Sequence, residues 1–348
     1  MLDQILLLYG IQPDEYQIEQ FGDGLINHTW KVTTLSEAYI LQQVNHHIFR
    51  SPFTIDQNIS KLKSFLNKNH PEYIFVSPLP SLSGLTLVRT DQGYFRLFTF
   101  IYNSHSLNVL TKKEEAYEAA RQFGKFGRLL SDFKADELGI TLPDFHNLGL
   151  RYQQFLHACE NASTEKKAKA ANCISFVLEN RDIVTTFEEL TINKEIPLRV
   201  IHHDTKISNV LFDSEQKGIC VIDLDTVMPG YFISDVGDMM RTYLSAASEE
   251  EKDFSKIEIR PDFFKAVCDG YLQEMGSVLT EKEKGYFNYA GKFIIFMQAI
   301  RFLNDYLEND RYYGKKYEDH NLNRAVNQIT LLRKFQHIET DLQIMPDY

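Results

Sequence analysis

Residues 199–226 read RVIHHDTKISNVLFDSEQKGICVIDLDT, and the rest of the chain is best interpreted outward from this stretch. Its pattern predicts a strand, a polar loop, a short strand, a turn and a buried strand that ends in acids. The loop carries Asp204, Lys206 and Asn209, and the buried strand delivers Asp223. An aspartate followed two residues later by lysine, five later by asparagine and nineteen later by another aspartate matches the polar groups of a phosphoryl-transfer site.

Each of these side chains has a defined use in such chemistry. Asp204 is placed to accept the proton of an attacking hydroxyl group, and Lys206 would neutralise charge on the transferred phosphoryl group. Asn209 and Asp223 supply the hard oxygen ligands that Mg²⁺ prefers. A loop-capping aspartate or an exposed lysine would look the same in isolation, but the joint spacing favours catalysis. We therefore expect ATP and Mg²⁺ as cofactors.

Composition narrows the class of protein. The 348 residues are 43% hydrophobic and 24% charged, with a formal charge of −11, which is typical of a folded protein of about two domains. This acidic balance argues against nucleic acid or an anionic membrane as a partner. The longest apolar run, 293–300, is too short to span a membrane, and no signal peptide is evident. We expect a cytoplasmic monomer or weak homodimer that binds ATP and a small molecule, with its four scattered cysteines reduced.

The pattern of the chain changes near residue 102. Before it, one helical stretch at 55–67 interrupts β-like segments at 17–21, 29–33, 39–44, 73–76, 85–89 and 94–101. After it, the pattern is helical at 113–131, 152–159, 164–180, 261–275, 281–306 and 322–335. We predict an α+β, protein-kinase-like bilobal fold. Residues 1–102 would form a small β-rich nucleotide-binding lobe, and residues 103–348 a large, mainly helical catalytic and substrate lobe.

A glycine-rich turn marks the expected nucleotide end. Segment 20–32, QFGDGLINHTWKV, lies between two predicted strands. Gly22 and Gly24 permit close approach of the backbone, whose amides can cradle phosphate oxygens. A GxG turn is also common in plain hairpins, so this assignment depends on the downstream loop. The predicted nucleotide-binding residues are Gly22, Asp23, Gly24, Asn27, Thr29 and Gln42.

The third predicted strand lacks a cation. In the kinase template a lysine on this strand holds the α- and β-phosphates, whereas segment 38–44, AYILQQV, places Gln42 there. A glutamine amide donates a hydrogen bond but carries no charge. Two hypotheses stay open: another cation, with Lys31 as one candidate, takes over this role, or nucleotide binding rests on Mg²⁺ and the glycine-rich turn.

The arrangement of His202, Asp204 and Asn209 as H-x-D-x-x-x-x-N, followed by Asp223 and Asp235, resembles the aminoglycoside phosphotransferase/choline kinase-like superfamily over nearly the whole chain. Four shorter segments resemble bacterial N-acetylhexosamine 1-kinases more narrowly. They are GDGLINHTW at 22–30, YILQQVN at 39–45, HDTK at 203–206 and AIRFLNDYL at 299–307. The resemblance implies an enzyme that phosphorylates the anomeric hydroxyl of GlcNAc or GalNAc with ATP and Mg²⁺.

The same resemblance implies further site residues. His28 and Arg301 would touch the sugar, and Asp223 would lie near both metal and substrate. These relatives also carry glutamine in place of the strand lysine. From the residues alone, His28 is equally an ordinary strand residue, and Arg301 on an apolar helix needs either a ligand or an acidic partner. Asp235 is expected to cap the next helix and tie it to the loop.

Three other functions stay open. A kinase of another small hydroxyl compound, such as homoserine, choline or an aminoglycoside, would use the same scaffold. The sequence ICVIDLDTV at 219–227 also matches the start of haloacid-dehalogenase-like phosphatases, with Asp223 as nucleophile and Asp225 as acid/base. That fold requires alternating strands and helices after the motif, and this chain is mostly helical there. A catalytically inactive kinase-like binding module is supported only by Gln42.

Overall fold

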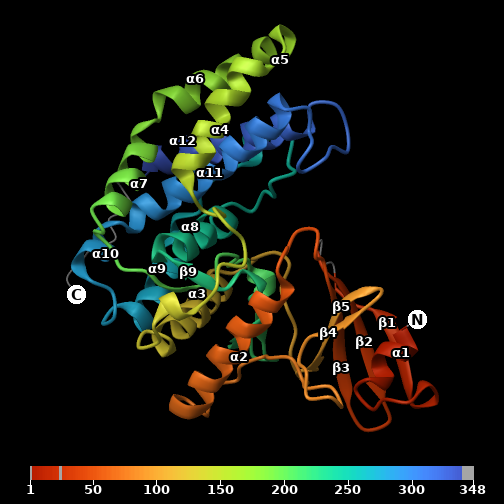
Figure 1. Ribbon diagram of the computed structural model, residues 1–348. Helices are drawn as coiled ribbons and strands as arrows, with labels where there is room; N and C mark the ends of the chain where they lie inside the picture. Colours follow the sequence, from red (N-terminus) through yellow and green to blue (C-terminus); the bar gives the residue numbers. More distant parts are fainter. Residues whose placement is uncertain (1, 23–25, 339–348) are drawn as a thin grey trace.

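The computed structural model describes residues 2–22 and 26–338 of the chain. An N-terminal lobe built on an antiparallel sheet lies beside a larger helical C-terminal lobe (Figure 1). The predicted α+β class is therefore confirmed.

The N-terminal lobe contains a five-stranded antiparallel sheet of order β1-β2-β3-β5-β4. Its elements are α1 (Leu2–Leu7), η1 (Pro13–Glu15), β1 (Tyr16–Gln20), β2 (His28–Thr34), β3 (Ala38–Val44), α2 (Pro52–Asn69), β4 (Val88–Thr90) and β5 (Gly93–Thr99). The strand predicted at 73–76 is wrong, because this segment is irregular. Pro71, Pro78 and Pro80 surround it and lack the N–H groups that a strand ladder needs.

The two faces of this sheet have different surroundings. One face packs with α1 into a small apolar core of Ile5, Leu6, Ile11, Val32, Leu41, Phe95 and Leu97. Because successive side chains of a strand alternate between faces, the residues between those core positions point to the other side. In the observed register, Thr29 pairs with Gln42 and Gln42 pairs with Arg96. These three side chains therefore form one polar row across β2, β3 and β5.

Helix α2 packs on the C-terminal lobe. Asn58 donates to the carbonyl oxygens of Gly139 at 2.8 Å and Val227 at 3.1 Å, and accepts from the Gly139 amide at 2.8 Å. The apolar face of α2 joins the large core of the C-terminal lobe through Ile55, Ile59, Leu62 and Leu66. Helix α2 of the N-terminal lobe is thus held against the segment that follows Asp223.

The C-terminal lobe consists of helices around two short antiparallel strand pairs. Its helices are α3 (Lys113–Leu129), α4 (Leu148–Asn161), α5 (Thr164–Lys169), α6 (Ala171–Glu179), α7 (Asp182–Ile192), α8 (Phe232–Tyr243), α9 (Pro261–Met275), α10 (Glu281–Gly285), α11 (Phe287–Leu307) and α12 (His320–Ile338). Strand β6 (Arg199–Ile201) pairs with β9 (Met228–Gly230), and β7 (Val210–Phe212) pairs with β8 (Gly218–Val221). Short 3₁₀ segments are η2 (Ala135–Glu137), η3 (Ile207–Asn209), η4 (Leu224–Thr226) and η5 (Phe254–Lys256).

The helices predicted at 113–131, 152–159, 261–275 and 322–335 are confirmed as α3, α4, α9 and α12. Two predicted long helices are each broken, at Ala170 between α5 and α6 and at Tyr286 between α10 and α11. Helix α7 was not predicted, because its sequence DIVTTFEELTI is rich in β-branched residues, which are weaker helix formers.

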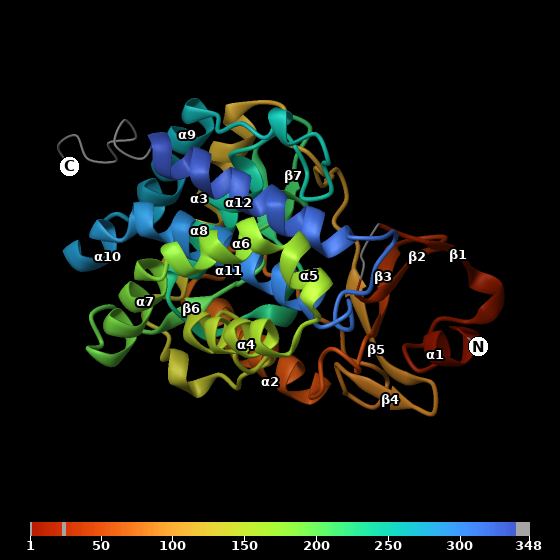
Figure 2. The same cartoon turned by 90° about the horizontal axis from the view of Figure 1, so that it is seen from above.

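Helix α11 is the centre of this lobe, with α4, α7, α8 and α12 around it (Figure 2). Most of its side chains are buried on all sides, which explains the apolar run at 293–300. Within the described residues no helix is both long and apolar enough to cross a membrane. All four cysteines are free, as expected, and all but Cys159 are buried.

The contact between α8 and α11 depends on Gly237. An ideal Cβ at this position would overlap the carbonyl oxygen of Ala290 and lie 2.6 Å from Cγ1 of Ile294. We predict that Gly237→Ala lowers the free energy of unfolding by about 1–3 kcal/mol, the usual cost of overpacking, as measured by urea denaturation. Gly285→Ala is the matched control, because no atom lies within 4 Å of its ideal Cβ. Equal stability of the two variants would contradict this packing.

Candidate active site

Helix α8 holds the loop between β6 and η3 in place. The carboxylate of Asp235 accepts from the backbone amides of His202 at 3.0 Å and His203 at 2.7 Å. Asp238, one turn later, accepts from the amide of Thr205 at 2.9 Å. Three backbone amides of the loop are therefore held by two carboxylates of one helix. Asp235 ties the helix to the loop as expected.

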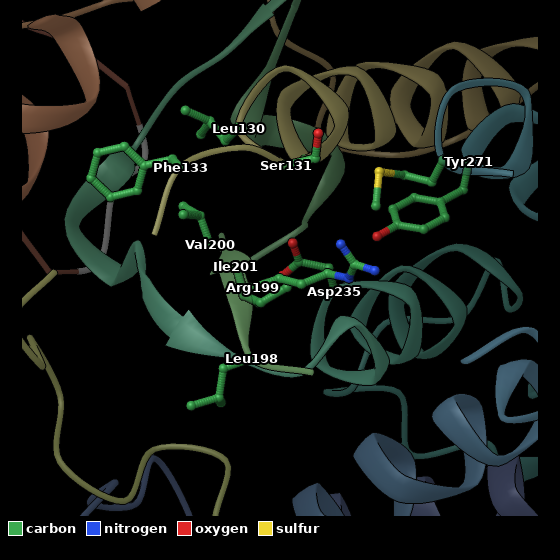
Figure 3. Close-up of a pocket in the computed structure, with 11 residues that line it drawn as sticks. Leu130, Ser131, Phe133, Leu198, Arg199, Val200, Ile201, Asp235 and Tyr271 are labelled. Atoms are coloured by element: carbon green, nitrogen blue, oxygen red, sulfur yellow. The ribbon is translucent and has the colours of Figure 1, made fainter. Parts of the chain in front are cut away.

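The capping role expected of Asp235 is wrong. Helix α8 starts at Phe232, and Asp235 lies inside its first turn with its carboxylate turned to the loop. Asp235 lines a small cavity of about 40 Å³. Figure 3 shows it there with Arg199 and Tyr271. Burial raises the pKa of Asp235 to about 7, against the effect of the two amides. This cavity holds at most a few water molecules, so it is too small for a nucleotide or a sugar.

The structure brings Asp204, Lys206 and Asn209 together. One oxygen of Asp204 lies 3.0 Å from Nζ of Lys206, and the other accepts from Nδ2 of Asn209 at 3.1 Å. Burial alone would lower the pKa of Lys206, but the carboxylates of Asp204 and Asp238 outweigh it and raise this pKa. Lys206 therefore stays charged, and half of its side chain remains exposed. A half-buried carboxylate and a charged, half-exposed lysine thus lie in contact.

The β7–β8 hairpin brings Asn209 next to the segment of Asp223. The backbone amide of Ile222 donates to the carbonyl oxygen of Asn209 at 2.9 Å, and a ring nitrogen of His202 lies 3.0 Å from the carbonyl oxygen of Ile222. Burial lowers the pKa of His202, which makes this histidine a neutral brace of the loop. Asp223 itself has a left-handed backbone with φ of 60°, a conformation that non-glycine residues adopt mainly under local constraint.

The donor set fits Mg²⁺. Because Nδ2 of Asn209 donates to Asp204, its amide oxygen is left for another partner. Asp223 is exposed to solvent on one side. The surrounding protein removes part of its hydration, and Asp225 and Asp204 add repulsion, so its pKa is raised to about 7. One amide oxygen and one carboxylate suit an ion that takes its remaining ligands from water and phosphates. No cluster of three or more His, Cys, Asp or Glu able to hold a metal occurs among residues 2–22 and 26–338.

The raised pKa of Asp223 predicts a pH dependence of metal binding. At pH 6 the neutral acid dominates, and at pH 8 the carboxylate does, and only the carboxylate binds a metal ion. We expect the affinity for Mg²⁺ in the presence of ADP to rise about tenfold from pH 6 to pH 8, measured by titration calorimetry. The variant Asp223→Asn, measured under the same conditions, shows how much of the pH dependence comes from protonation of the nucleotide. A wild-type curve parallel to that of Asp223→Asn would contradict this role.

The polar row on the sheet continues into the C-terminal lobe. Gln42 donates to Oγ1 of Thr29 at 3.2 Å, and its amide oxygen accepts from Nη2 of Arg96 at 2.9 Å and from Nε at 3.2 Å. Nη1 of Arg96 lies 2.6 Å from a carboxylate oxygen of Asp225. Sequence analysis missed Arg96. Its position opposite Gln42 follows only from the register of β3 against β5, which the sequence pattern does not give.

The glycine-rich turn reaches the same carboxylate. Asn27 donates to the second oxygen of Asp225 at 2.8 Å and accepts from the amide of Asn45 at 3.0 Å. Gly22 is exposed and has φ of +76°, which explains the need for glycine there. Asp23 and Gly24 lie outside the described residues. Lys31, the candidate replacement cation, instead places its ammonium 4.6 Å from the centre of the Phe100 ring.

His28 and Arg301 lie in different surroundings. His28 is the first residue of β2, exposed, with its ring 6.2 Å from that of Trp30. In the described part of the chain no hydrogen bond or ring contact joins His28 to Asp204 or Arg301. Arg301 on α11 donates to Gln298 at 3.2 Å and lies 5.5 Å from the ring of Phe145.

Arg301 lines a cavity of about 210 Å³ at the end of α11. Arg151 of α4 lines it too, and burial together with the charge of Arg301 lowers the pKa of Arg151. The other lining residues are Gln154, Ile300, Asn304, Asp305, Glu308, Tyr312 and Tyr313. Phe145, under Arg301, lies 6.3 Å from the ring of His203. Ring contacts through Phe145 therefore connect Arg301 to the residue next to Asp204.

The arginines of this cavity have no carboxylate partner among the described residues. Arg151 donates to the side chain of Gln154 at 3.0 Å and to a backbone oxygen at 2.8 Å, and its buried Nε has no partner there. Asp305 is already used, because its oxygens accept from the amides of Tyr312 at 2.7 Å and Tyr313 at 2.9 Å. The cavity thus offers free cationic donors.

A β-rich lobe and a helical lobe, with two acids, an asparagine and a lysine at their junction, define a kinase-like phosphotransferase. Residues 17–278 match the phosphotransferase enzyme family, APH. Since this match covers most of the chain, the protein belongs to that family.

Solved structures of similar fold extend over nearly the whole chain. A microcompartment-associated aminopropanol kinase has a TM-score of 0.65 at 14% identity and covers 99% of both chains. Spectinomycin phosphotransferase APH(9)-Ia, in complex with ADP and spectinomycin, has a TM-score of 0.61 at 16% identity, covering 99% of this chain and 98% of its own. A Plasmodium vivax ethanolamine kinase has a TM-score of 0.61 at 16% identity, covering 97% and 89%. These likenesses confirm the predicted kinase-like fold.

Proposed function

We propose that this phosphotransferase moves the γ-phosphoryl group of ATP to the anomeric hydroxyl of an N-acetylhexosamine, GlcNAc or GalNAc, to give the sugar 1-phosphate. The observation that carries the choice of acceptor is the cavity lined by Arg151 and Arg301, which is linked to the loop of Asp204 through the rings of Phe145 and His203. Its volume of about 210 Å³ is below the roughly 300–1,000 Å³ of pockets for drug-sized ligands, so it suits one small molecule.

The charges in this cavity favour a neutral acceptor rich in oxygen atoms. Guanidinium groups donate hydrogen bonds and accept none, and the carbonyl of an acetamido group together with sugar hydroxyls supplies suitable acceptors. Asp305 and Glu308 also line the cavity, so its two positive and two negative groups balance in formal charge. A neutral acceptor needs no net charge from its pocket, whereas aminopropanol and ethanolamine, the substrates in the names of two structural neighbours, are amines.

The remaining residues divide the work of transfer. Asp204 would orient the sugar hydroxyl and accept its proton, and Lys206 would balance charge on the moving phosphoryl group. Asn209 and Asp223 would hold Mg²⁺, which neutralises the phosphates when bound. Nucleotide binding by Gly22, Asn27 and Thr29 in the lobe of residues 1–102, and sugar contact by His28, are part of the same proposal.

Asp204→Ala tests the mechanism. Loss of the positioned base should lower kcat by about 10²–10⁴-fold with KM for ATP little changed, measured by ADP release. Near-wild-type turnover in this variant would refute the role of Asp204.

An acceptor panel tests the substrate. We expect ADP release with GlcNAc and GalNAc, and a ³¹P NMR signal coupled to the anomeric proton of the product. Homoserine, choline and an aminoglycoside serve as comparison acceptors. Turnover confined to one of these would show that the scaffold is a kinase of a different hydroxyl compound.

Arg301→Gln and Arg151→Gln test the cavity. Each change removes a charged hydrogen-bond donor, worth about 1.5–3 kcal/mol. We therefore predict a rise of roughly tenfold to a hundredfold in KM for the acceptor and an unchanged KM for ATP, in steady-state kinetics. The exposed Arg333, which lies over the Phe176 ring on another part of the molecule, supplies the control Arg333→Gln. An equal effect in all three variants would mean that charge in general, and not this cavity, matters.

A catalytically inactive binding module is the second candidate, and Gln42 was its support. The arrangement around Gln42 weakens that support, because a buried arginine lies directly beside it. Nucleotide binding without ADP formation from any acceptor would favour the inactive module.

A further inference from the structure

We propose that Arg96 is the cation that binds the α- and β-phosphates of ATP, in place of the lysine that β3 lacks. This inference rests on the proposed function only in taking ATP as the donor, and it does not depend on the acceptor. The positive charge that is missing at Gln42 on β3 is then supplied from β5, the neighbouring strand of the sheet.

The register of the sheet places Arg96 in the right row. Directly opposite residues on neighbouring antiparallel strands have Cβ atoms about 4.5–5.5 Å apart, and Arg96 is opposite Gln42. An arginine side chain is long enough to bridge this distance between the two strands. The guanidinium can therefore occupy the space that a lysine at the Gln42 position would fill.

Gln42 holds this guanidinium in one orientation. Its amide oxygen accepts from two nitrogens of Arg96, while its amide nitrogen is anchored on Thr29. Both ends of the glutamine amide are thus used within the protein. Gln42 is a positioning residue for Arg96 rather than a phosphate ligand.

The third partner, Asp225, leaves the guanidinium able to bind an anion. Nη1 contacts Asp225 and Nη2 contacts Gln42, and each of these nitrogens carries a second hydrogen. Such a planar fork matches the geometry of phosphate oxygens. Arg96 is only 3% exposed and Asp225 only 1%, so water competes little for the remaining donors.

This ion pair lies next to the residues that we propose for binding the nucleotide phosphates and the metal ion. Asp225 follows the metal-binding candidate Asp223 by two residues. Its second oxygen is bound by Asn27 of the glycine-rich turn. Arg96 therefore lies between the turn that would cradle the phosphates and the acid that would hold Mg²⁺.

A simple lobe-to-lobe ion pair is the alternative role. Buried ion pairs contribute little to stability compared with apolar packing, so stability alone is a weak reason for this pair. The two roles differ in what they require of Asp225. If the ion pair only joins the lobes, loss of Arg96 and loss of Asp225 should have the same effect. If Arg96 binds the phosphates, Arg96 is required for ADP binding, and Asp225 only orients its guanidinium.

Titration calorimetry with Mg²⁺·ADP and with adenosine separates these roles. For Arg96→Gln we expect ADP affinity to fall about tenfold to a hundredfold and adenosine affinity to stay within about twofold. For Asp225→Asn we expect the ratio of ADP to adenosine affinity to stay near that of the wild type. Arg89→Gln, on the exposed side of edge strand β4, should change neither affinity.

A charge-relocation variant keeps the test valid if Arg96→Gln does not fold, as judged by circular dichroism. The double variant Gln42→Lys/Arg96→Gln returns the cation to β3, and we expect it to bind ADP at least fivefold more tightly than adenosine. The proposal is overturned if this variant shows no preference for ADP, if Arg96→Gln weakens both ligands equally or neither, or if Asp225→Asn loses ADP binding as Arg96→Gln does.

The outcome is independent of the acceptor assignment. Failure of GlcNAc and GalNAc in the acceptor panel would remove the proposed sugar substrate and leave these nucleotide affinities unchanged. Conversely, normal ADP binding by Arg96→Gln would contradict the role of Arg96 without affecting the proposed phosphorylation of a sugar.

Discussion

The carboxylate of Asp235 bonded to two consecutive loop amides is the interaction on which the site depends. A loop cannot present a base, a lysine and an asparagine in one direction unless its own backbone is fixed. Asp235 and Asp238 supply that restraint from α8, which is itself fixed through its glycine contact with α11. The buried helix would therefore support the proposed catalysis without touching a reactant.

The distribution of charge explains how an acidic protein can bind acidic ligands. With a formal charge of −11, the chain as a whole repels nucleotides, and only local cations can reverse this in the cleft. Lys206 lies at the transfer end, Arg96 lies where the sheet meets the C-terminal lobe, and Arg151 and Arg301 lie in the side cavity. Each position corresponds to one part of the proposed reaction: the moving phosphoryl group, the nucleotide phosphates and the acceptor.

The cleft also shows where prediction from the sequence reached its limit. Spacing in one loop was enough to predict that Asp204, Lys206 and Asn209 lie together, because residues close in sequence are constrained by one local geometry. Two of the predicted strands differ from the structure: 73–76 is irregular, because prolines overrode its β-like composition, and the strand predicted at 85–89 begins only at Val88. Arg96 could not be predicted, since its position depends on pairing with Gln42, 54 residues away in the sequence, and a shift of one residue would turn it to the other face.

The sequence by itself determined the class of fold and the local set of phosphoryl-transfer groups, because hydrophobic period and short-range spacing are properties of neighbouring residues. The tertiary structure decided which distant residues share a site. It joined β5 to the segment after Asp223 through Arg96 and Asp225, and it placed two arginines from α4 and α11 in one cavity. Such partnerships arise when separate elements pack into one core and bring buried charges within contact distance, and no local pattern records them.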